Sequence, residues 1–123
     1  MEDISFEEFG TLLDEVADGL PPEIFVNLNG GISLIEEELY HPESPNLYIL
    51  GQYHAGGHLG RYINIYYGSF MKLYNGRTSH SLKKEIDKVL RHEFLHHLEN
   101  LAGEKELEIK DAIQLARYKG LGL

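Results

Sequence analysis

The fold is decided by one stretch of the chain, residues 82–101, which reads LKKEIDKVLRHEFLHHLENL. Its apolar residues recur at helical spacing and form one broad stripe, made by Leu82, Ile86, Val89, Leu90, Phe94, Leu98 and Leu101. Thr78, Ser79 and Ser81 precede the stripe as candidate N-caps, and Gly103 follows it as the expected C′ residue. The pattern predicts a long helix that buries one face.

Further helices are expected on both sides of this one. The first begins at Ser5, where Glu8 three positions on completes a capping box, and it ends at Gly19 before two prolines. A short helix is expected over residues 69–74, and a final helix over residues 105–118. The helical segments therefore lie at the two ends of the chain.

The middle of the chain has strand character. Residues 32–39, 47–53 and 61–67 are the expected strands, and the last two predict an antiparallel hairpin around a glycine-rich loop. The chain has no internal repeat. The order predicts a single α+β domain over residues 1–123, with an N-terminal helix, a small antiparallel sheet and two C-terminal helices.

Composition limits the classes of partner and of metal site. The 123 residues include 20 acidic and 11 basic ones, a formal charge of −9 that disfavours nucleic acid as a partner. No cysteine is present, so a metal ion must be held by imidazole and carboxylate. The acidic first four residues and the absence of a long apolar run predict a cytoplasmic protein that does not enter a membrane.

The long helix carries a pattern that predicts metal chemistry. His92 and His96 are four residues apart, so they lie on the same face of a helix and can bind one Zn²⁺ or similar divalent ion. Glu93 flanks that ion and is placed to take a proton from a metal-bound water. The pattern predicts a hydrolytic metal site with Glu93 as the general base.

A catalytic zinc site usually has three protein ligands, and two residues are candidates for the third. Glu99 lies one turn beyond His96 on the same stripe, and its side chain leans back toward the metal. Glu106 lies three residues past Gly103, where the chain turns and can fold a carboxylate back. The residues leave both candidates open.

Other histidines are expected to have smaller roles. His97 falls on the apolar side of the helix and is expected to be a partly buried, hydrogen-bonded imidazole. His54 and His58 bracket the glycine-rich loop, where a spacing of four residues is weak evidence of metal binding. A strand edge that faces the metal helix would also let a peptide substrate bind by strand addition.

Four segments together resemble a known family. They are SFEEF at 5–9, LPPE at 20–23, INIYYG at 63–68 and HEFLHH at 92–97, and they are similar to the small bacterial zincin-like metallopeptidases, also called minimal zincins. The resemblance implies an α+β zincin core, a bound zinc or similar divalent ion, and Glu93 as the base. It also implies peptidase activity, although the natural substrate is undefined for most members of the family.

The chain departs from the family pattern after the second histidine. The usual pattern continues His-x-x-Gly-x-x-Asp, and its aspartate is the expected third ligand. Here four more residues precede Gly103. If they are an insertion, Gly103 matches the family glycine and Glu106 matches the aspartate. If the helix runs on, Glu99 takes that role instead.

The leading hypothesis is a zinc-dependent peptidase that hydrolyses a peptide or protein substrate through a metal-activated water. The alternative is a metal-binding interaction or regulatory module with little activity, since 123 residues leave few loops to build a deep cleft. A third hypothesis is a purely structural domain without metal. The sequence carries no signal for a particular oligomeric state.

Overall fold

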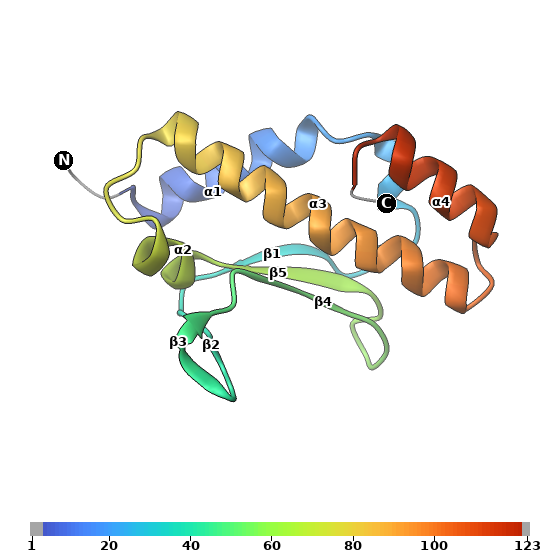
Figure 1. Cartoon of the computed structure of the whole chain (residues 1–123), viewed down its shortest axis with the longest axis horizontal. Coiled ribbons are helices and arrows are strands. Elements are labelled where there is room, and N and C mark those ends of the chain that lie inside the picture. The colour runs from blue at the N-terminus through green and yellow to red at the C-terminus, as the bar shows by residue number, and fades with distance from the viewer. Residues whose placement is uncertain (1–3, 122–123) are drawn as a thin grey trace.

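Helix α3 (Ser79–Gly103) is 25 residues long and runs across the length of the molecule (Figure 1). The computed structural model describes residues 4–121. Thr78 is the N-cap, and its hydroxyl oxygen accepts a hydrogen bond from the Ser81 N–H at 3.1 Å. The apolar stripe is confirmed, since six of its seven residues are at most 1% exposed, namely Leu82, Ile86, Leu90, Phe94, Leu98 and Leu101.

The end of α3 differs from the prediction. Gly103 is the last helical residue instead of the C′ residue, and Lys105 takes the left-handed conformation with φ of 61°. The Glu106 N–H donates to the Leu101 carbonyl at 2.9 Å, and the Lys105 N–H donates to Ala102 at 3.1 Å. These two bonds form a Schellman motif around a lysine. The prediction for Gly103 was wrong because the buried Leu101 and these bonds fix the helix end, whereas glycine preference alone does not.

Two other helices pack on α3. Helix α1 (Phe6–Asp18) has the predicted capping box, with the Glu8 N–H donating to the Ser5 hydroxyl oxygen at 3.1 Å. A short 3₁₀ turn, η1 (Pro22–Phe25), follows it. Helix α4 (Ile109–Tyr118) lies along the C-terminal half of α3 (Figure 1). It begins four residues later than predicted, because residues 105–108 form the turn after α3.

The strands form two small sheets. Within the described residues they are β1 (Gly31–Ile35), β2 (Tyr40–His41), β3 (Ser44–Tyr48), β4 (Gly51–His54) and β5 (Tyr62–Tyr66). The larger sheet has the order β1-β5-β4, and β2 and β3 form a separate hairpin that projects from the body (Figure 1). Helix α2 (Tyr67–Leu73) directly follows β5, close to its predicted place.

The sheet corrects two predictions. The β4–β5 hairpin is antiparallel as predicted, with Gly51 opposite Ile65. However, β1 is parallel to β5, so the larger sheet is mixed and not purely antiparallel. The strand predicted over residues 47–53 is divided between β3 and β4, which belong to different sheets. Alternation of side chains along one strand does not reveal its partner or direction, and for this reason both features escaped prediction.

The core lies between the helices and the larger sheet. Ile63 and Ile65 of β5 are fully buried and belong to the same apolar cluster as Phe94 of α3 and Phe9 of α1. The architecture is therefore α+β, as predicted, with the helices covering one face of the larger sheet (Figure 1). Among the described residues, no helix combines the length and apolar character needed to cross a membrane.

Candidate metal centre

The two histidines of the motif meet on the exposed stripe of α3. The Nε2 atoms of His92 and His96 are 3.0 Å apart, and the two rings are nearly perpendicular at a centroid distance of 4.5 Å. Zinc binds imidazole nitrogen at about 2.0–2.1 Å, so two such nitrogens on one tetrahedral ion lie roughly 3.3 Å apart. The two Nε2 atoms, which are within hydrogen-bond distance of each other, are therefore within a few tenths of an ångström of the spacing that one ion requires.

Glu93 lies beside this pair but on a different side of the helix. It is only 6% exposed and belongs to the side of α3 that faces β4. Burial raises the pKa of the Glu93 carboxyl, while the two imidazoles and a backbone hydrogen bond from Tyr53 act in the opposite direction. A carboxylate with a raised pKa is a better proton acceptor near neutral pH than an exposed one.

Glu99 contacts the pair from the other end. Its carboxylate is 3.1 Å from Nδ1 of His96, the ring nitrogen that does not face His92. An Nδ1–H donated to Glu99 leaves the lone pair of His96 on Nε2, where the two histidines converge. The contact therefore selects the tautomer and the ring orientation that a metal ligand needs.

Glu106 is placed elsewhere. Its carboxylate forms an ion pair with the guanidinium of Arg61 and accepts a hydrogen bond from the Asn27 amide at 3.0 Å. The Arg61 guanidinium lowers the pKa of the Glu106 carboxyl. Thus Glu99 joins the histidine pair, whereas Glu106 is held by other partners. Over residues 4–121, no group of three His, Asp or Glu side chains is already arranged to hold a metal ion.

His97 is buried on the side of α3 that faces β4, one turn beyond Glu93. It is fully buried, its Nδ1 is 2.8 Å from the Tyr53 hydroxyl, and its Nε2 is 2.7 Å from the Val26 carbonyl oxygen. Since the carbonyl can only accept, Nε2 carries the proton and Nδ1 accepts from tyrosine. Burial lowers the pKa of His97, which keeps the ring neutral. The prediction of a hydrogen-bonded imidazole is confirmed, and the burial is complete.

Tyr53 is the residue that sequence reasoning missed. Its hydroxyl contacts both His97 and Asn100 of α3, and its backbone N–H points to the Glu93 carboxylate. These partners are at least 40 positions away along the chain, so no local pattern reveals them. Tyr53 thereby ties the edge strand β4 to the helix that carries the motif.

The two histidines of the β4–β5 hairpin, His54 and His58, do not lie on the face of β4 that carries the Tyr53 side chain. His54 hydrogen-bonds the Gln52 side chain at 3.2 Å and stacks on the Tyr62 ring at 4.7 Å, so it projects from the opposite face of β4. His58 lies exposed in the glycine-rich loop. Because β4 is the edge of the larger sheet, its second backbone edge is free of strand partners within the described residues.

Comparisons with known proteins support the fold and name no activity. No protein-family model matches the chain, and no curated protein does. A solved structure, that of the conserved hypothetical protein TTHA0227 from Thermo thermophilus, is similar with 29% sequence identity and a TM-score of 0.73. The similarity covers 81% of this chain and 99% of that one. The class defined here is therefore an α+β domain that carries a histidine pair beside a buried glutamate.

Proposed function

We propose that this protein is a divalent-metal-dependent peptidase in which His92 and His96 bind the ion and Glu93 is the general base. The observation that carries the proposal is the convergence of the two Nε2 atoms at 3.0 Å, next to a glutamate that is only 6% exposed. Burial of an ionisable carboxylate is costly without a compensating charge, and a bound cation supplies one. The resemblance to the zincin-like metallopeptidases supports the same proposal.

The donor set suits zinc. Neutral imidazole nitrogens and carboxylate oxygens are ordinary zinc ligands, and the chain offers no thiolate as an alternative. We assign Glu99 as the carboxylate that completes the ligand set, because it already contacts His96 while Glu106 is paired with Arg61.

The chemistry then divides between the ion and the chain. A zinc ion held by these residues would act as a Lewis acid that makes the attacking water more acidic and polarises the carbonyl that is attacked. Glu93 accepts the proton of the attacking water and passes it to the nitrogen of the leaving amine. The free edge of β4 offers backbone N–H and C=O groups to an extended peptide, which aligns the substrate along α3.

Zinc-loaded protein and its Glu93→Gln variant test the proposal on a mixed peptide library. We expect the wild type to cleave peptides and the variant to lose at least about a hundredfold of that activity, since it keeps both ligands but has no base. Zinc titration calorimetry on both proteins is the control. Full cleavage by a zinc-loaded Glu93→Gln protein would refute the mechanism.

A second candidate function is a metal-binding interaction module without catalysis. It is favoured by the size of the chain, since 123 residues leave few loops to build a deep substrate cleft. This module would bind zinc stoichiometrically and cleave no member of the library. A protein purified without a metal-affinity tag and found free of divalent metal would argue against both functions.

A further inference from the structure

An apolar groove runs between α3 and α4, next to the histidine pair. It has a volume of about 410 Å³, which is within the range of small-ligand sites. Leu95, Ala102 and Gly103 of α3 line one side, and Ile109 and Ile113 of α4 line the other. The groove therefore has aliphatic walls and a floor of small residues.

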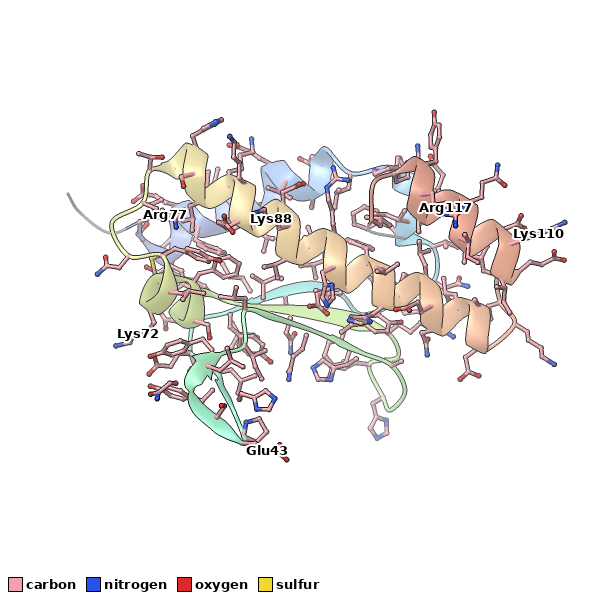
Figure 2. All side chains as sticks on the ribbon, viewed as in Figure 1. Glu43, Lys72, Arg77, Lys88, Lys110 and Arg117 are labelled. Atoms are coloured by element: carbon pink, nitrogen blue, oxygen red, sulfur yellow. The ribbon has the colours of Figure 1, made fainter. Side chains whose placement is uncertain are left out.

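The α4 side of the groove leaves large apolar side chains in water. Ile109 is 66% exposed and Ile113 is 37% exposed. The charged residues Lys110 and Arg117 lie on the outer surface of the same helix (Figure 2). These two isoleucines can therefore bury apolar surface against a ligand, and each square ångström removed from water makes the free energy of binding more favourable.

The α3 side of the groove includes two small residues, Ala102 and Gly103. A Cβ atom added at Gly103 would meet no other atom within 4 Å. Gly103 lines the groove, is helical and has no positive φ, so a side chain can be added at this position without backbone strain.

The groove adjoins the candidate metal centre through one residue. Glu99 lines the groove, and the same carboxylate is hydrogen-bonded to Nδ1 of His96 at 3.1 Å. A larger hollow of about 580 Å³ lies between α1 and α3, but it is lined by Lys83, Lys84 and Lys88 and includes none of the motif residues. Proximity to the reacting position thus singles out the α3–α4 groove.

We propose that this groove receives a bulky aliphatic or aromatic side chain of the peptide substrate, adjacent to the bond that is cut. The inference rests on the proposed function for its catalytic consequence. The neighbours of the histidine pair lead to two surfaces: Glu99, which contacts His96, lines the groove, and Glu93 is contacted by the backbone of Tyr53 in the edge strand β4. A peptide whose cleaved bond lies at the histidine pair would extend past Glu99, so that one side chain next to that bond enters the groove.

Binding to the metal-free protein tests the groove without catalysis. Acetyl-leucine amide and acetyl-phenylalanine amide, titrated in NMR experiments, should shift the signals of Gly103, Ala102 and Ile113, and acetyl-serine amide should not. The Gly103→Leu variant fills the groove and should abolish the shifts of Ala102 and Ile113. Lys88→Leu, which adds the same side chain to the exposed N-terminal half of α3, is the matched control and should leave them unchanged (Figure 2).

Cleavage by the zinc-loaded protein gives the second readout. Peptides with Leu or Phe next to the cleaved bond should have a kcat/KM roughly 10–200-fold higher than the same peptides with Ser at that position. The Gly103→Leu variant should reduce this preference at least about tenfold. Shifts in the groove without any cleavage would overturn the proposed function and keep the binding site. Cleavage with no Leu or Phe preference, and no shifts, would overturn the groove and keep the function.

Discussion

Glu93 and His97 are buried ionisable residues on the same helix, but they differ in how well their polar atoms are hydrogen-bonded. His97 has a hydrogen-bond partner on each ring nitrogen, so its neutral form is fully satisfied. Glu93 is buried beside two imidazoles, and burial raises the pKa of its carboxyl. A charged Glu93 therefore costs stability in the metal-free protein, which is the expected signature of a residue retained for chemistry.

Glu93→Gln should stabilise the metal-free protein at neutral pH. A carboxyl with a raised folded-state pKa contributes stability below its unfolded pKa of about 4.3, and that contribution is lost as pH rises through the folded pKa. Glutamine does not titrate, so the Tm of the Glu93→Gln variant should exceed that of the wild type by a few degrees at pH 7. This difference should shrink at pH 4. Thermal unfolding in chelator measures this.

The control is Glu99→Gln, a carboxylate on the same helix that is 55% exposed. Its Tm difference from the wild type should be small at both pH values, because its carboxylate stays hydrated. A Tm gain for Glu93→Gln that is equal at pH 4 and pH 7 would mean that desolvation of the Glu93 charge is not the cause.

Metal affinity distinguishes the two candidate third ligands. Glu99→Gln should weaken zinc binding by about 10–100-fold, since it removes the carboxylate that contacts His96. Glu106→Gln should change zinc affinity by less than about threefold, because Glu106 is paired with Arg61. Competition titrations against a zinc chelator measure both. The opposite order would show that Glu106 leaves Arg61 to bind the ion.

At the scale of elements, prediction succeeded where the information is local. The capping box of α1 and the apolar stripe of α3 depend on residues three or four positions apart, and the strands of the β4–β5 hairpin are joined by one short loop. The parallel pairing of β1 with β5 joins segments about 30 residues apart, and the sequence offers no local signal for it. The same holds for the Tyr53–His97 and Arg61–Glu106 pairs that surround the candidate site.

The end of α3 yields a prediction of its own. Lys105 has φ of 61°. In this left-handed conformation the Cβ atom of lysine has a steric cost, which glycine avoids because it has no Cβ. Lys105→Gly should therefore raise the free energy of unfolding by about 0.5–1 kcal/mol, measured by urea denaturation. Lys110→Gly, within α4, should lower it by a similar amount. Destabilisation by Lys105→Gly would contradict the Schellman geometry.

At the scale of the whole molecule, the site depends on how closely the sheet approaches α3. Gly51 of β4 faces Val89 of α3, and a Cβ atom at Gly51 would lie 2.9 Å from Val89 Cγ1 and 3.1 Å from Ile65 Cδ1. Glu93 is one turn further along the same side of α3. The glycine thus permits the contact between layers that buries the proposed base.

Gly51→Ala should separate β4 from α3 and lower the free energy of unfolding by about 1–3 kcal/mol, because the β-branched side chain of Val89 has little freedom to move aside. Loosening this contact should also admit water to Glu93, so the gain from Glu93→Gln should shrink in the Gly51→Ala background. Gly103→Ala is the matched control, since its Cβ meets open space within a helix, and it should stabilise by about 0.5–1 kcal/mol. Urea denaturation of the single and double variants measures these differences. An additive pair would show that the approach of the sheet does not set the burial of the base.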